Sequence, residues 1–174
     1  MKQTVKCCYG VSSKVSDFDH VFMIDYDDIE LVDVLKHIVS IQNDFNLSDM
    51  YIIRSTHGFN VICLDMLTAS LIYNIGVAIR SPADRNFFKY GFKRGYYVLR
   101  FDKDKELIGI VANYSDKYSK SLAHKRFLEW YFNITIHPSN FDENDKIDII
   151  QYPSNKNGYH LVDKEIPPYR VTGC

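Results

Sequence analysis

Two aspartates lie at the end of an apolar segment near the start of the chain. Asp25 and Asp27 follow Val21-Phe22-Met23-Ile24, a short apolar run that predicts a buried strand. Residues two apart on a strand leave the same face, so the two carboxylates would lie side by side. They would repel each other unless a cation lies between them, and Mg²⁺ prefers carboxylate oxygens. The pair therefore predicts a divalent-metal site. The alternative is that Asp27 or Asp28 caps the next helix while Asp25 is solvated.

Other polar residues lie at comparable places later in the chain. The segment Ser55-Thr56-His57-Gly58 predicts a turn between two strands, and Asp102 follows another apolar strand. Two acidic strand ends and a turn with Ser, His and Gly, all on one sheet, predict a metal site assembled from distant segments. The alternative for Asp102 is a plain charged turn over 102–106, because turns favour such residues without any chemistry.

A basic and aromatic segment gives the clearest binding signal. Its basic residues are Arg80, Arg85, Lys89, Lys93, Arg94 and Arg100, and its aromatic residues are Phe87, Phe88, Tyr90, Phe92, Tyr96 and Tyr97. Basic side chains neutralise phosphates, and aromatic faces stack on unpaired bases. The segment predicts a surface for single-stranded nucleic acid. The alternative is a surface helix whose aromatic side chains pack inward and whose charges are solvated.

The order of these motifs resembles the archaeo-eukaryotic primase superfamily, and in particular the small primase-polymerases of plasmids and viruses. The resemblance lies in the D-x-D of Asp25 and Asp27, the segment 55–60 and the strand that ends in Asp102, within residues 20–104. It implies that Asp25, Asp27 and Asp102 bind Mg²⁺ or Mn²⁺ and that His57 acts with them in catalysis. The chain would then be a DNA-replication nucleotidyltransferase that joins nucleotides on a single-stranded DNA or RNA template.

The same resemblance implies that the turn binds the phosphates of a nucleotide, through Arg54, Ser55, Thr56, Gly58 and Asn60. Gly allows the backbone a close approach or a positive φ there. Many members of the superfamily carry a His two residues after this Gly, where the present chain has Asn60. Asn can hydrogen-bond a phosphate but cannot carry a positive charge. Three alternatives follow: His57 substitutes from the turn, Asn60 serves with reduced power, or the site is inactive.

The sequence offers a second histidine for the nucleotide site and two other functions for the chain. His160, in Gly158-Tyr159-His160, is a second candidate for the nucleotide site. An inactive site would make the chain a non-catalytic or degenerate replication protein that binds single-stranded nucleic acid. A replication endonuclease with a tyrosine nucleophile would need a His-x-His motif, which the sequence lacks.

The elements that must position these residues alternate between strands and helices. We expect strands at 4–11, 21–26, 50–54, 59–64, 96–101, 107–112, 147–152 and 159–162, and helices at 29–45, 66–79, 85–90 and 119–132. Strands 96–101 and 107–112 are expected to form a hairpin, and Gly91 and Gly95 to break the helix before it. The first helix is expected to bury the stripe of Ile29, Val32, Leu35, Ile38, Val39 and Gln42. This order predicts an α+β fold with an RRM-like or ferredoxin-like sheet, mixed or antiparallel, and helices packed on it, as in a primase-polymerase core.

Length and composition limit the remaining possibilities. The 174 residues predict a single domain, with a core at about 4–162 and a C-terminal tail at 163–174. A net charge of −1 excludes general electrostatic attraction to nucleic acid, so a local basic patch is needed. The four cysteines lack zinc-site spacing and are expected to be reduced thiols of a cytoplasmic protein, in the host cell if it is viral. Partners expected for such a protein are nucleotides, the template and a helicase or other replication protein, and no membrane.

Overall fold

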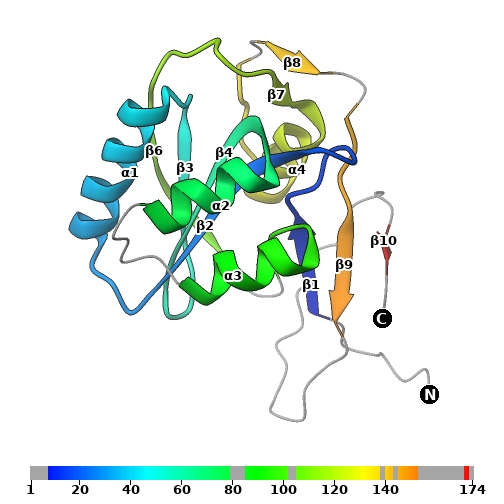
Figure 1. The fold of residues 1–174 in the computed structure, drawn as a ribbon, viewed down its shortest axis with the longest axis horizontal. Coiled ribbons are helices and arrows are strands. Elements are labelled where there is room, and N and C mark those ends of the chain that lie inside the picture. The colour runs from blue at the N-terminus through cyan, green and yellow to red at the C-terminus, as the bar shows by residue number, and fades with distance from the viewer. Residues whose placement is uncertain are drawn as a thin grey trace.

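The computed structural model describes residues 8–78, 85–101, 105–137, 140–142, 145–152 and 171–172. This part of the chain is an α+β structure whose mixed sheet curls into a half-barrel (Figure 1). Its helices are α1 (Leu31–Phe45), α2 (Ala69–Ala78), α3 (Arg85–Arg94) and α4 (Leu122–Phe132). Its strands are β1 (Cys8–Ser12), β2 (Asp19–Asp27), β3 (Met50–Arg54), β4 (Gly58–Thr68), β5 (Val98–Arg100), β6 (Glu106–Val111), β7 (Lys120–Ser121), β8 (Phe141–Asp142), β9 (Ile149–Tyr152) and β10 (Val171–Thr172). The predicted α+β class is confirmed.

The central sheet is built around β4. One edge of β4 pairs with β3, which in turn pairs with β6, and the other edge pairs with β2, all antiparallel. The β2–β4 register shifts between Val21 and Phe22, and there Asp65 of β4 pairs instead with Lys120 of β7. The long β4 strand therefore pairs with three strands, β2, β3 and β7, along its length.

A second sheet has the order β10-β9-β1-β5. It continues from the central sheet through the β1–β2 connection, where Val21 N donates to Ser13 O at 2.8 Å and Ser13 N donates to Tyr97 O at 2.8 Å. The predicted hairpin of 96–101 with 107–112 is therefore wrong. Its two strands belong to different sheets, because β5 pairs with β1 and β6 pairs with β3. The predicted strand at 159–162 lies outside the described residues, and the described part of the predicted tail is β10, which pairs with β9.

The core lies on both sides of the central sheet. Alternate residues of each strand face opposite sides, as the period of two requires. One side packs against α1, α2 and α3 with the buried side chains of Phe22, Ile24, Tyr26, Val34, Ile38, Ile41, Ile72, Ile75 and Phe88. The other side packs against α4 with those of Val21, Met23, Tyr51, Ile53, Ile62, Phe127, Leu128 and Tyr131.

The first helix buries a different stripe from the predicted one. Val32 and Val39 are 55% and 40% exposed, whereas Val34, His37, Ile38, Ile41 and Gln42 are buried. His37 faces the core because its Nδ1 meets the hydroxyl of Tyr26 at 2.6 Å. The helix is preceded by Glu30, whose side chain makes no capping hydrogen bond, so neither Asp27 nor Asp28 caps it. That alternative explanation of the acidic cluster is wrong.

Two glycines shape the helix α3 and its exit. The prediction that Gly91 breaks the helix is wrong, since α3 runs through it to Arg94. A Cβ on Gly91 would lie 2.2 Å from Cδ1 of Tyr97, so the missing side chain lets the helix pass close to that ring. Gly95 has a φ of +87° and ends the helix as predicted, since glycine adopts the left-handed region without strain.

Two further expectations concern the environment of the chain. Among the helices of the described residues, none is long and apolar enough to cross a membrane. Cys63 is a buried free thiol, and the other three cysteines fall where the structure describes no side chain.

Candidate active site

The β2 strand presents Asp25 and Asp27 on one face. Ile24 and Tyr26 alternate with them and are fully buried against α1, so the two carboxylates point to the opposite side. In the ladder with β4, Asp25 lies opposite Asn60, and Asp27 lies opposite Gly58. The predicted placement of the two aspartates on one face is confirmed.

A tight turn between β3 and β4 faces this acidic pair. It is closed by Ser55 N, which donates to Gly58 O at 2.9 Å, and it is tied to β2 by Asp28 N, which donates to His57 O at 2.8 Å. A Cβ on Gly58 would lie 1.9 Å from the carbonyl oxygen of Tyr26. Only glycine permits this approach, so Gly58 supports the site through backbone packing.

One pocket collects these groups, with a volume of about 410 Å³. Its lining residues are Asp25, Asp27, Ser55, Thr56, His57, Asn60, Val98, Leu99, Arg100 and Lys105. They come from β2, the β3–β4 turn, β4, β5 and the segment just before β6. Segments far apart along the chain thus supply two carboxylates, two basic side chains and a histidine to one cavity.

A chain of hydrogen bonds crosses the floor of the pocket. Asn60 is 3% exposed, and its Nδ2 donates to Oδ1 of Asp25 at 2.6 Å. The ammonium of Lys105 donates to Oδ1 of the same Asn60. Asn60 therefore links the carboxylate of Asp25 to the ammonium of Lys105. The lysine supplies a positive charge that an asparagine cannot carry.

Lys105 is a basic residue of the pocket that sequence reasoning missed. It follows Asp102-Lys103-Asp104 in a segment for which the sequence predicted either a metal ligand at Asp102 or a charged turn, and neither prediction gave Lys105 a role. Its ammonium also lies 5.2 Å from the centre of the Phe101 ring. No local pattern marks this lysine, because the hydrogen bond with Asn60 joins residues 45 positions apart in the sequence.

The other predicted residues separate into three groups. Arg100, predicted to bind nucleic acid, lies in the pocket with the aspartates. Arg54 does not line it: its Nε lies 3.6 Å from Oε2 of Glu106, and its guanidinium lies 5.9 Å from the Phe59 ring centre. Arg80, Asp102 and His160, together with the side chain of Arg85, lie outside the described residues.

The helix α3 carries the rest of the predicted nucleic-acid surface. Lys89, Lys93 and Arg94 are exposed, and so are Tyr90 (58%) and Phe92 (46%). Phe88 and Tyr97 are instead buried in the core, where they pack against each other edge to face. The aromatic residues of this segment are thus divided: some pack in the core, as one prediction had it, and others are exposed, as a nucleic-acid surface requires.

The donor set of the pocket fits a magnesium ion that is held jointly with substrate phosphates. Mg²⁺ is commonly bound by one or two carboxylates plus phosphate oxygens, and Asp25 and Asp27 provide that number. Across the described ranges, no three or more His, Cys, Asp or Glu side chains are grouped so that they could hold a metal ion.

Buried polar pairs hold the strands that frame the site. Burial raises the pKa of Tyr26 and lowers that of His37, so both partners of this hydrogen bond are neutral near pH 7. On the other side of the sheet, His124 Nε2 lies 2.8 Å from Ser12 O and connects α4 to β1. Burial lowers the pKa of His124 to about 4.

Comparisons of the chain with known protein families, with curated proteins and with solved structures gave no match.

Proposed function

We propose that this chain is the catalytic core of a primase or primase-polymerase, a nucleotidyltransferase that joins nucleotides on a single-stranded template with Mg²⁺ or Mn²⁺. The observation that carries the proposal is the single pocket shared by Asp25, Asp27, the turn at Ser55–His57 and Asn60. The resemblance to the archaeo-eukaryotic primase superfamily assigns these same positions to metal and nucleotide.

The basic side chains of the pocket suit a triphosphate. Lys105 and Arg100 bring positive charge to the pocket that holds the two carboxylates. The Ser55 and Thr56 hydroxyls line the same cavity and can donate hydrogen bonds to phosphate oxygens. Lys105 would supply the positive charge that many members of the superfamily take from the histidine at the position of Asn60.

Asp25 and Asp27 would hold the metal, with Asp102 as the third ligand that the resemblance implies. A bound divalent ion stabilises the charge that develops on the attacking and leaving oxygens of nucleotidyl transfer. The chain's own contribution is to fix the two carboxylates on one strand, with Asn60 orienting Asp25 through its amide.

The template would approach over α3. Its exposed Lys89, Lys93 and Arg94 can neutralise phosphates, and the exposed Tyr90 and Phe92 can stack on bases. The next element along the chain is β5, which carries Arg100 into the pocket. We further propose that the central sheet is the RRM-like sheet of such a core.

The test is primer synthesis and extension by the purified protein with Mg²⁺ or Mn²⁺, nucleotides and a single-stranded template. Asp25→Asn and Asp27→Asn are each expected to abolish the product, because each removes a metal ligand. Asp17→Asn is the matched control, since the Asp17 side chain is 87% exposed and pairs with Lys14 at the surface. Absence of product from the native chain, with nucleotide binding unchanged in Asp25→Asn, would refute the enzymatic function.

A second function is favoured by the hydrogen bond between Asn60 and Asp25. This bond occupies one oxygen of a proposed metal ligand, as expected in a replication protein that binds single strands without catalysis. That function predicts no product from the native chain, and single-strand binding that is sensitive to salt and unaffected by Asp25→Asn.

A further inference from the structure

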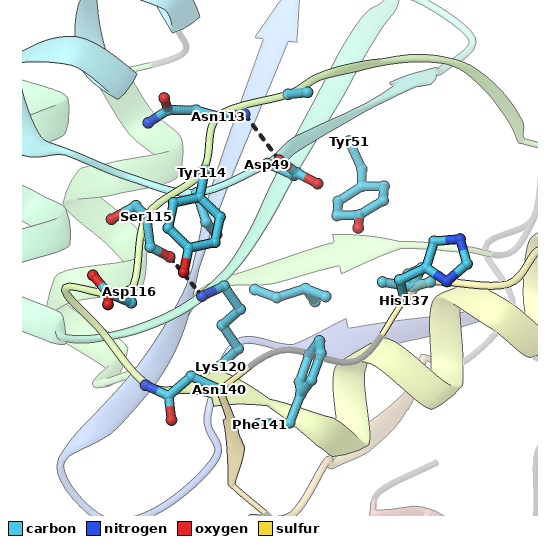
Figure 2. Close-up of a pocket in the computed structure, with 14 residues that line it drawn as sticks. Asp49, Tyr51, Asn113, Tyr114, Ser115, Asp116, Lys120, His137, Asn140 and Phe141 are labelled. Atoms are coloured by element: carbon cyan, nitrogen blue, oxygen red, sulfur yellow. Dashed lines mark hydrogen bonds between the residues drawn. The ribbon is translucent and has the colours of Figure 1, made fainter.

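A second and larger pocket lies at the other end of the central sheet. Its volume is about 910 Å³, within the range that holds a small organic ligand. It is lined by the residues before and at the start of β3, the segment after β6, Lys120 of β7, and residues around β8 (Figure 2). It shares no residue with the Asp25 pocket, which lies at the opposite ends of β3 and β6.

Tyr51 provides a hydrogen-bond donor in the wall of this pocket. The residue is 3% exposed, and its hydroxyl makes no hydrogen bond to any described residue. Figure 2 draws the ring among the lining side chains with the hydroxyl on the pocket side. Burial and the negative charge of Asp49 raise the pKa of Tyr51, so the hydroxyl stays protonated. It can therefore donate to an acceptor on a ligand, and a hydrogen bond of this kind contributes about 0.5–1.5 kcal/mol.

Lys120 is a second donor with unused capacity. It is 7% exposed, and its ammonium donates to Ser115 O at 2.8 Å, as the dashed line in Figure 2 shows. Its distance to Oδ1 of Asp65 is 3.9 Å, which is an ion pair but not a hydrogen bond. An ammonium has three donor hydrogens, and the described residues accept a hydrogen bond from one of them, so two can serve a ligand.

The charges of the pocket disfavour an anionic ligand. Lys120 is balanced by Asp65, which is 1% exposed and already accepts hydrogen bonds from the backbone N and the hydroxyl of Ser48. Asp49 and Asp116 also line the pocket and leave it with net negative charge. Of these two, Asp49 accepts from Asn113 N through Oδ1, which leaves its Oδ2 as an acceptor for a ligand. A neutral ligand that carries both acceptors and donors therefore fits best.

Aromatic faces complete the pocket. Tyr114 is 90% exposed and Phe141 is half-buried, and both are lining residues. Such side chains stack on flat rings, and stacking on an aromatic side chain contributes about 1–3 kcal/mol per base. A planar heterocycle is the neutral ligand that uses these faces and the polar groups together.

We propose that this pocket binds a guanine base, either as a free nucleoside or as an unpaired base of a strand. Guanine presents O6 and N7 as acceptors for Lys120 and Tyr51, and N1–H and the 2-amino group as donors for Asp49. Adenine keeps N7 as an acceptor but has an amino donor in place of O6, so one of the two donors of the pocket would face another donor. The proposal is independent of the Asp25 pocket and of the nucleotidyltransferase function.

The test compares guanosine, inosine, adenosine and GMP by titration calorimetry on the full chain. Guanosine is expected to bind most tightly, and inosine about tenfold more weakly because it lacks the 2-amino donor. Adenosine is expected to bind more weakly still, and GMP more weakly than guanosine because of the nearby carboxylates. Equal affinities for guanosine and adenosine, or no binding of guanosine, overturn the proposal.

Tyr51→Phe is the decisive variant, because it removes a hydroxyl that makes no hydrogen bond to the described residues. Guanosine affinity is expected to fall about tenfold while the Tm does not fall. Asp17→Asn, at an exposed side chain outside both pockets, is the control and leaves guanosine binding unchanged. Unchanged affinity in Tyr51→Phe, or loss of binding in Asp17→Asn, overturns the assignment to this pocket.

The two sources of the base are separated with a short single strand that holds one guanine among thymines. Tighter Tyr51-dependent binding of the strand than of guanosine assigns an unpaired base as the ligand. The opposite order assigns a free nucleoside.

Discussion

Gly58 connects the fold of this protein to its candidate site, and replacing it with alanine tests both. The added Cβ would lie 1.9 Å from the carbonyl oxygen of Tyr26, 2.9 Å from its carbonyl carbon and 3.2 Å from Cα of Asp27. These are backbone atoms of β2, which cannot turn aside as a side chain could. Tyr26 is fully buried and hydrogen-bonded to His37, so the strand is also held from the other side.

The expected effect is large for a single methyl group. Overpacking of this kind is destabilising by about 1–3 kcal/mol, and backbone obstacles place Gly58→Ala at the upper end. With a urea dependence of about 1–3 kcal/mol per M, the unfolding midpoint should fall by roughly 1 M. Because β2 must move away from β4, Asp27 and Asp25 are also displaced from the turn, and Mn²⁺ or nucleotide affinity should fall with the stability.

The assay is urea unfolding followed by circular dichroism, with Gly109→Ala as the matched control. Gly109 lies in β6, and a Cβ there would meet nothing within 4 Å. Gly109→Ala is expected to change the free energy of unfolding by no more than about 1 kcal/mol, in the stabilising direction if the backbone accepts it. Equal midpoints for the two variants would show that the close approach of Gly58 to Tyr26 is not present in the protein.

Three further predictions concern charge. Burial lowers the pKa of His124 from 6.5 to about 4, so between these pH values the unfolded chain binds more protons than the folded chain. The free energy of unfolding should therefore fall as the pH drops from 6.5 to 4, by up to about 1.4 kcal/mol per pH unit. Urea titrations at several pH values measure this slope. A His124→Gln variant that keeps the same slope would contradict this. Lys105→Met should weaken triphosphate binding by about tenfold or more in calorimetry, while Lys36→Met on the exposed face of α1 should not. Lys89→Ala with Lys93→Ala should reduce the slope of log K against log salt for single-stranded DNA by about 0.7 for each phosphate that the variant no longer neutralises, measured by fluorescence anisotropy; an unchanged slope would exclude α3 as the strand-binding surface.

The local parts of the site could be predicted from the sequence. The strand of Asp25 and Asp27, the turn at Ser55–Gly58 and the strands on either side of it all depend on neighbouring residues, and the structure contains them. Their meeting in one pocket also followed from the expectation of a shared sheet.

The features that could not be predicted are contacts between residues far apart in the sequence. The hairpin of 96–101 and 107–112 was expected because the two strands are neighbours in the sequence, but each pairs with a strand from the first third of the chain. The predicted buried stripe of α1 did not include His37, because its partner Tyr26 lies on another element. Lys105 was assigned to a charged turn for the same reason, since only the folded chain brings it to Asn60.

The position of β1 in the second sheet has a consequence for biosynthesis. This strand, Cys8–Ser12, lies between β5 and β9, so it needs partners at residues 98–100 and 149–152. At a ribosomal rate of about 5–20 residues per second, β1 waits roughly 7–28 s for β9 to be made. During that interval the edge of β1 that pairs with β9 is open to other chains, and a chaperone that shields nascent strands would raise the yield of native protein.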